Sequence, residues 1–259
     1  VELESAFGPI IKKLAVNNID LTKNAVEVSP IAHYHMGGIK VNTKMQTRIH
    51  GLFAAGEAVG GANGANRLSG NAIPEAFVFG KRAGQYASEY TCTKTILTTS
   101  DGVSALSKVL TKHKIDNILI KDNNDIRMTS IMKKLQDIMW NDVGVIRTRK
   151  SLTNALDLIN NLNVNYFSKI LPPDITVYNK QLMDWLDLRN SLLCAEAVCL
   201  SAYNRKESRG AHQMEDIPIT LTEFEKNQVI EMNDGCLLTK WENVSKIEFK
   251  LKKKLQALK

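Results

Sequence analysis

The sequence lacks several features that mark common classes of protein, and each absence narrows what the chain can do. Its four cysteines (Cys92, Cys194, Cys199 and Cys236) form no C-x-x-C pair. This spacing argues against a zinc ribbon and against an iron–sulfur cluster held by this chain alone. We therefore expect reduced, buried thiols in a cytoplasmic protein.

Two further absences concern membranes and nucleotides. No apolar run approaches the roughly 20 residues that a membrane helix needs, and the charged opening VELESAFGPI is unlike a signal peptide. The glycine fingerprint G-x-G-x-x-G, which places a helix start against a pyrophosphate, is missing as well. Because the chain does not begin with Met, we expect a fragment or a processed chain.

The composition is that of a soluble, globular protein. With 259 residues, of which 44% are hydrophobic and 24% charged, the chain can form one large domain or two ordinary ones. The net charge of +7 comes mostly from scattered lysines, and we expect no nucleic-acid partner. The basic tail KIEFKLKKKLQALK could contact nucleic acid or an acidic partner, but a solvated, fraying helix end is the simpler interpretation.

The chain changes character near residue 95. Before it, short apolar runs alternate with glycine-rich turns such as GLFAAGE and GGANGANRLSGN, which is typical of an α/β domain. After it, MTSIMKKLQDIMWNDVGV, SLTNALDLINNLN and NKQLMDWLDLRNSLLCAEAVCL have helical apolar spacing. Two stripes define the expected helix faces: Ile131, Leu135, Ile138 and Met139, and then Leu182, Trp185, Leu186 and Leu193. The sequence therefore predicts an α/β portion followed by an α-helical bundle, preceded by a short helix and strand in residues 1–30.

Two features near residue 60 are candidates for binding a ligand. The run from Leu52 to Ala55 predicts a buried strand, and Glu57 just after it could reach sugar or ribityl hydroxyls; a loop glutamate in water is the alternative. The segment NAIPEAFVFGKRAGQYASEY predicts a helix whose first N–H groups, near Ala72 and Ile73, could face a phosphate or a reduced flavin ring. An ordinary helix start would have the same pattern.

Histidine and arginine side chains supply a second group of candidates. His33 and His35 alternate, so on an extended strand they would share a face and could bind metal. No third ligand lies nearby, so we expect no metal site. A histidine paired with an arginine such as Arg67 would instead clamp carboxylates, since the guanidinium offers two parallel donors. A core histidine with ordinary hydrogen bonds is the alternative.

Taken in order, the motifs resemble one family. HYHMGGI, TRIHGLFAAGE, GANRLSGN and VFGKRAG, followed by MWNDVGVIRTRKSLTNAL and NRKESRGAHQMEDIP, are similar to the flavoprotein subunits of succinate dehydrogenase and fumarate reductase, and to the related L-aspartate oxidase. The resemblance runs from about residue 30 to residue 218. Several ordered motifs at compatible spacing are far more specific than any one of them.

The resemblance implies a role for each matched residue. His33 and Arg67 would each bind a carboxylate of a small dicarboxylate, Glu57 would hold the FAD ribityl chain, and the backbone at Ala72 and Ile73 would lie against the flavin. It also implies a division into the end of a capping domain (1–30), the C-terminal segment of an incomplete FAD-binding domain (31–98) and a helical C-terminal domain (99–259). The reaction would interconvert succinate and fumarate, with electrons passed to an iron–sulfur subunit.

Other elements of the family pattern are expected upstream of this chain. The proton-delivering arginine and the flavin-attaching histidine have no match here, so we expect the N-terminal remainder of the flavoprotein as a partner and assign no catalytic residue. The location implied is cytoplasmic, peripheral at the inner face of the cell membrane, with membrane contact only through partner subunits.

Departures from the family pattern put the exact substrate in question. Asn63 stands where the family has histidine, His35 replaces Thr or Met, and the element MED replaces RxD at residues 214–216. L-aspartate oxidase and a non-catalytic helical docking module stay open as alternatives. The segment RKESRGAH is interpreted as a salt-bridged helix end that stops at Gly210.

Overall fold

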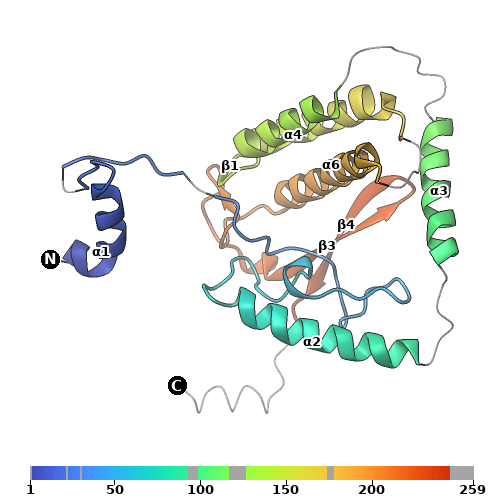
Figure 1. The fold of residues 1–259 in the computed structure, drawn as a ribbon, viewed down its shortest axis with the longest axis horizontal. Coiled ribbons are helices and arrows are strands. Elements are labelled where there is room, and N and C mark those ends of the chain that lie inside the picture. The colour runs from blue at the N-terminus through green and yellow to red at the C-terminus, as the bar shows by residue number, and fades with distance from the viewer. Residues whose placement is uncertain are drawn as a thin grey trace. The chain divides into compact units, whose positions relative to one another are not determined.

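The computed structural model describes residues 2–21, 23–29, 31–92, 99–116, 127–173 and 178–245. The chain divides into two units, Val1–His33 and Tyr34–Lys259, and the ribbon is drawn in Figure 1. The basic tail from residue 246 onward, for which a solvated helix end was expected, lies outside the described residues.

The first unit begins with helix α1 (Glu2–Ala15), which confirms the short helix expected there. Pro9 lies inside α1, and Phe7 departs from helical geometry with φ −128° and ψ 16°. A proline ring removes one helical hydrogen bond and clashes with the preceding turn, so a kink at this place is expected. The strand predicted to follow is absent from the described part of this unit.

The second unit is mainly helical. Its long helices are α2 (Ala72–Thr91), α3 (Thr99–Asp116), α4 (Met128–Asp142), α5 (Arg149–Asn161) and α6 (Lys180–Asn204). Short 3-10 turns are η1 (Gly56–Ala58), η3 (Phe167–Lys169) and η4 (Thr222–Phe224), and η2 (Leu162–Tyr166) is a π-helical turn. No helix among the described residues is long and apolar enough to cross a bilayer.

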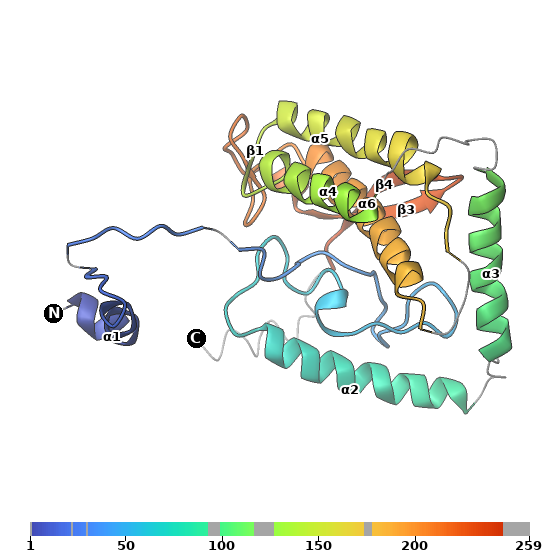
Figure 2. The ribbon, with the colours of Figure 1, turned by 45° about the horizontal axis from the view of Figure 1, so that its top comes forward.

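Helices α4, α5 and α6 pack together and form the main core, as Figures 1 and 2 show. Ile131 of α4, Leu152 of α5 and Trp185 of α6 are each 1% exposed or less. The predicted helices are confirmed, but the face of α6 is shifted from the expected one. Leu188 and Leu192 are buried deeply, whereas the predicted Leu186 and Leu193 are only partly buried. The buried positions of α6 advance by three or four residues, which keeps them on one face of the helix.

The starts of two core helices are capped by the residue types that the sequence places there. Thr148 and Ser151 form a reciprocal capping box at the start of α5. The Asn179 side chain accepts a hydrogen bond from the Leu182 N–H at the start of α6. Such caps satisfy N–H groups that have no partner within the helix, and each contributes about 1 kcal/mol.

The C-terminal part also contains strands that the helical-bundle prediction did not include. β1 (Ile146–Arg147) pairs in parallel with β2 (Gln213–Met214), and β3 (Lys226–Asn233) forms an antiparallel hairpin with β4 (Cys236–Asn243). Asp234 and Gly235 connect the hairpin strands with φ of 48° and 83°. Asp-Gly is the preferred pair for a tight turn of this kind, so this local signal could have predicted the hairpin.

The prediction of a buried strand over Leu52–Ala55 is wrong. Phe53 makes only an isolated bridge with Gln46, and Leu52 is 45% exposed. Gly51 and Gly56 on either side have positive φ values of 80° and 65°, which end the extended conformation. This region buries a small second core of Met45, Ala54 and Val59 against α2.

The expectation of buried thiols holds for one cysteine only. Cys199 of α6 is fully buried and its thiol contacts the Leu152 carbonyl at 3.3 Å. Burial raises the pKa of this thiol to about 11. Cys92, Cys194 and Cys236 are exposed and free.

We expect that truncating two long apolar side chains of α6 lowers the free energy of unfolding by unequal amounts, because one is buried in the core and the other is exposed. Leu188→Ala should lower the free energy of unfolding by about 2–5 kcal/mol, because it leaves a cavity between packed helices. Met183→Ala, at a position that is 57% exposed, should change it by only about 0.5 kcal/mol. Denaturant titration measures both values, and equal losses would contradict the assignment of the buried face.

Candidate functional site

The loop Gly60–Asn71 begins where the backbone around Gly60 packs against the backbone around Gly38. Ile39 and Val59 form an isolated parallel bridge, with the Ile39 N–H donating to the Ala58 carbonyl at 2.8 Å. A Cβ on Gly38 would lie 2.5 Å from the Ala58 oxygen, and one on Gly60 would lie 2.7 Å from the Gly38 nitrogen. At these two positions the contact between backbones therefore requires glycine.

Arg67 lies half-buried within this loop. Its guanidinium carbon is 4.4 Å from the centroid of the Tyr34 ring, a cation–π contact, and Nη1 donates to the Leu68 carbonyl at 3.2 Å. Nε is buried and has no hydrogen-bond partner in the described part of the chain. A buried donor without a partner costs about 1–3 kcal/mol, so the guanidinium retains a donor that an anionic ligand would satisfy.

A buried glutamate holds the tyrosine beneath Arg67. The Tyr34 hydroxyl donates to Oε2 of Glu75 at 2.6 Å, and the Asn63 amide donates to the same oxygen at 2.8 Å. Glu75 is 7% exposed, and its Oε1 has no partner among the described residues. The hydrogen bond to this carboxylate, together with burial, raises the pKa of Tyr34 above its usual value.

The same contacts assign a structural role to Asn63. Its amide is engaged with Glu75, and Nδ2 also lies 3.4 Å from the Tyr34 hydroxyl. Asn63 therefore supports the residues that orient Arg67. Neither Tyr34 nor Glu75 was among the predicted site residues. Glu75 is nevertheless the one charge in NAIPEAFVFG and follows Pro74 in the first turn of a predicted helix.

Glu57 lies in η1, directly after the segment that contains Phe53. It is exposed, and its Oε1 accepts a hydrogen bond from the His35 backbone N–H at 2.9 Å. This bond links the two motifs HYHMGGI and GLFAAGE. The remaining acceptor capacity of the carboxylate is compatible with hydroxyl donors of a ligand.

The predicted helix start is present at α2, which begins at Ala72. Asn71 occupies the N-cap position without making a side-chain cap hydrogen bond. Ala72 is half-buried, and Ile73 is 66% exposed. The first N–H groups of a helix have no partner within it and carry partial positive charge, so this uncapped start fits an anionic or carbonyl-bearing edge of a cofactor.

His33 is exposed and ends the first unit, whereas Arg67 belongs to the second. The pairing of His33 with Arg67 in a carboxylate clamp stays a prediction. Across the described ranges, no group of three His, Cys, Asp or Glu side chains is arranged to hold a metal ion.

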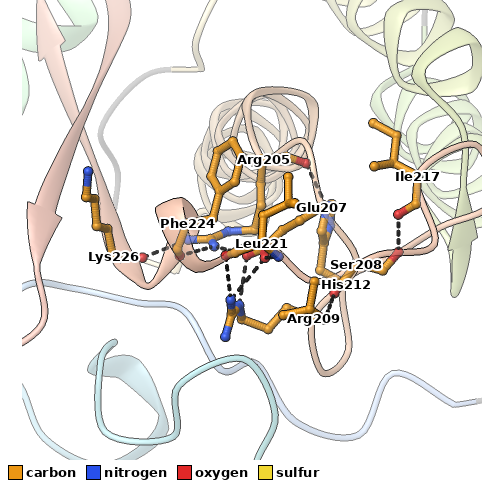
Figure 3. Close-up of polar contacts among 10 residues, drawn as sticks. Arg205, Glu207, Ser208, Arg209, His212, Ile217, Leu221, Phe224 and Lys226 are labelled. Atoms are coloured by element: carbon orange, nitrogen blue, oxygen red, sulfur yellow. Dashed lines mark hydrogen bonds and ion pairs between the residues drawn. The ribbon is translucent and has the colours of Figure 1, made fainter.

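The segment RKESRGAH forms a second polar cluster just after α6, shown in Figure 3. Glu207 is fully buried, and its Oε1 accepts from Arg205 Nη1 at 2.7 Å and from Arg209 Nε at 2.8 Å. Its Oε2 accepts from Arg209 Nη2 at 3.1 Å and from the Leu221 N–H at 2.9 Å. Burial alone would raise the pKa of Glu207, but these donors outweigh it and leave the pKa lowered.

The expected salt bridges are therefore present, but they do not form a helix end that stops at Gly210. Helix α6 already ends at Asn204, and Gly210, with φ of 57°, belongs to a turn beyond it. The ion pairs converge on one buried carboxylate because an unpaired charge cannot be kept inside a protein.

His212 is held in one protonation state by its neighbours. Its Nε2 lies 3.1 Å from the Arg205 carbonyl, and its Nδ1 lies 3.1 Å from Nη1 of Arg147. Because a carbonyl only accepts and a guanidinium only donates, the ring must be the neutral tautomer that carries its proton on Nε2. Burial, with the nearby positive charges of Arg147 and Arg205, lowers the pKa of His212.

Comparison with known families covers most of the chain. Residues 132–254 match the family model for the C-terminal part of the fumarate reductase flavoprotein, and residues 8–73 match a model for an FAD-binding domain. A solved quinol–fumarate reductase with menaquinol molecules superimposes with a TM-score of 0.76 and 30% identity, over 95% of this chain and 43% of that one.

Several relatives match the chain over most of its length. A fumarate reductase (CoM/CoB) polypeptide of Methanothermobacter marburgensis is 35% identical over 81% of this chain and 37% of its own length. The 8-methylmenaquinol:fumarate reductase flavoprotein subunit of Wolinella succinogenes is 32% identical over 93% and 40%. L-aspartate oxidase of Acinetobacter baylyi is 31% identical over 83% and 37%. The chain thus spans 37–40% of the length of these relatives.

The geometry around His212 predicts a loss of stability on acidification. The unfolded histidine titrates near pH 6.5, and the folded one titrates lower. The unfolded state therefore binds more protons below about pH 6.5, and the free energy of unfolding falls with a slope of at most ~1.4 kcal/mol per pH unit from this group. Denaturant titrations between pH 8 and 5 measure this slope.

Two variants isolate the contribution of His212. His212→Gln keeps one donor and one acceptor but does not titrate, so its unfolding free energy should fall less on acidification than that of the parent. His50→Gln, at an exposed position, should retain the parental slope. Identical slopes for the parent and His212→Gln would contradict the assigned neutral state.

Proposed function

Because this chain belongs to the family of fumarate reductase and succinate dehydrogenase flavoproteins, we propose that it forms part of an FAD-dependent oxidoreductase that interconverts succinate and fumarate. The observation that carries the proposal is the Arg67 guanidinium, which stacks on Tyr34 and keeps a buried Nε without a partner. Relatives whose names specify fumarate reductase support this choice of substrate.

Arg67 binds one carboxylate of the substrate in this proposal, and His33 binds the other. A guanidinium offers parallel donors that match a carboxylate, and charge-assisted hydrogen bonds of this kind are roughly twice as strong as neutral ones. Tyr34 limits where the guanidinium can lie, and Glu75 and Asn63 hold Tyr34 in place. Two cationic or polar groups, one for each carboxylate, would select a dicarboxylate over a monocarboxylate.

Glu57 and the start of α2 hold the cofactor. The Glu57 carboxylate accepts hydrogen bonds from ribityl hydroxyls, and the N–H groups of Ala72 and Ile73 donate to the flavin edge. Bound FAD supplies the centre that accepts or gives a hydride. The residues of this chain bind and orient the two molecules, and we assign the proton transfer to no residue within it.

We place the protein in the cytoplasm, peripheral at the inner face of the membrane. Electrons pass to an iron–sulfur subunit in this proposal, as the family of the chain implies. The four cysteines of this chain have no cluster-binding spacing. The menaquinol named with a solved neighbour supports a route to a lipid-soluble carrier. Membrane contact occurs only through partner subunits, and the N-terminal remainder of the flavoprotein completes the FAD site.

A single substitution tests the substrate site in the FAD-bound flavoprotein. Arg67→Lys keeps the charge but loses the parallel donors, so kcat/KM for fumarate should fall by about 10- to 100-fold. Arg48→Lys is the matched control, because Arg48 is exposed and its ion pair with Glu231 is long, at 3.9 Å. Fumarate reduction is followed with a reduced viologen dye, and FAD content by absorbance. Unchanged kcat/KM in Arg67→Lys would exclude the proposed role.

L-aspartate oxidase is the second candidate, since relatives with that activity match the chain at similar identity. Two measurements on the same protein preparation distinguish the oxidase from the proposed function. Release of hydrogen peroxide with L-aspartate favours the oxidase, whereas co-purification with a cluster-bearing subunit favours the proposed function. Arg67→Ala separates both enzymes from the non-catalytic docking module. An enzyme loses dicarboxylate turnover in the full-length protein, whereas a docking module keeps binding its partner.

A further inference from the structure

The loop that carries Arg67 is contacted by a turn from the C-terminal part of the chain. Arg209 and His212 close this turn with reciprocal backbone hydrogen bonds of 2.8 and 3.0 Å. At its tip the Ala211 N–H donates to the Ala65 carbonyl at 2.8 Å. Ala65 lies two residues before Arg67 in the same loop.

The contact leaves no space for a side chain at the tip of the turn. A Cβ on Gly210 would lie 2.5 Å from the Ala65 oxygen and 2.6 Å from its carbonyl carbon. Both atoms belong to the backbone, so the clash cannot be relieved by a rotamer change. Any larger residue at position 210 must displace the turn or the loop.

The turn is held in place by the Glu207 cluster (Figure 3). This cluster consists of Glu207 and the groups that donate to its carboxylate, namely Arg205, Arg209 and the Leu221 N–H. Arg209, at its start, is held by two hydrogen bonds to the Glu207 carboxylate and a third, of 2.9 Å, to the Leu221 carbonyl. His212, at its end, is held by the Arg205 carbonyl and by Arg147. Both ends of the turn are therefore anchored by charged or polar groups that are wholly or partly buried.

We propose that Glu207, Arg209 and Gly210 are positioning residues for the substrate-binding arginine. The Glu207 cluster fixes the turn, the turn fixes Ala65, and Ala65 sets where Arg67 meets the substrate. This inference rests on the proposed function, in which Arg67 binds a dicarboxylate. A displacement of about 1 Å at a binding group can cost about 100-fold in rate, so a distant anchor can control the site without touching the substrate.

Gly210→Ala tests the contact, and Gly235→Ala is its matched control. Both glycines have positive φ, at 57° and 83°, so alanine strains the backbone in each. Only at Gly210 would the new Cβ meet another residue, because a Cβ on Gly235 has no atom within 4 Å. In the FAD-bound flavoprotein, malonate serves as a non-reacting dicarboxylate probe, titrated by the change in flavin absorbance.

Gly210→Ala should raise the dissociation constant for malonate by about 10- to 100-fold with FAD content unchanged, because a misplaced guanidinium loses charge-assisted hydrogen bonds to the ligand. Gly235→Ala should leave the dissociation constant at the parental value. If Gly210→Ala binds malonate as tightly as Gly235→Ala, the inference is overturned. If Arg67→Lys loses malonate affinity and Gly210→Ala does not, the inference is rejected but the proposed function stands. No loss of malonate affinity in Arg67→Lys rejects the proposed function itself.

A double-mutant cycle separates positioning from general weakening of the fold. If Gly210 acts through Arg67, the double variant should bind malonate no more weakly than Arg67→Lys alone. Multiplicative losses would mean that the two positions act independently and would overturn the inference.

If Gly210→Ala does not yield FAD-bound protein, Arg209→Lys replaces it, since lysine keeps the charge but cannot hold both Glu207 oxygens. Lys206→Arg, at the exposed neighbouring position, is then the control, and parental affinity in Arg209→Lys would reject the inference.

Discussion

The arrangement of the C-terminal part depends on the ion pairs and hydrogen bonds made by the buried carboxylate of Glu207. A carboxylate removed from water is tolerated only when its lone pairs are filled and its charge is balanced. Arg205 and Arg209 supply the balance, and Arg205 in turn donates to the carbonyls of Phe224 and Lys226 at 2.9 Å each. One buried charge thereby joins the end of α6, the turn at Gly210 and the start of β3.

A second buried carboxylate organises the candidate substrate site in the same way. Glu75 receives the Tyr34 hydroxyl and the Asn63 amide on one oxygen. Tyr34 then offers its ring to the Arg67 guanidinium. Asn63, which stands where the family motif has histidine, donates its amide to this carboxylate from the loop. Backbone packing against Gly38 requires one of the small residues of the loop, Gly60.

Local patterns predicted the helices well and the strands poorly. The apolar spacing of α4, α5 and α6 is set within each helix, so periodicity reports it directly. Leu52–Ala55 has the composition of a buried strand, yet glycines with positive φ on both sides stop the pairing after one bridge. The β3–β4 hairpin has a strong local turn signal in Asp234–Gly235, which the prediction of a helical C-terminal part did not include.

The sequence by itself determined the family, the order of its motifs and the helical character of the C-terminal part. It also pointed to Arg67 as a carboxylate ligand, through the motif GANRLSGN. Only the tertiary structure decided what surrounds that charge. Tyr34 and Glu75 are 41 residues apart, and Ala65 meets a turn around Gly210 far along the chain. Such contacts depend on how distant segments approach each other, and neither periodicity nor spacing records that approach.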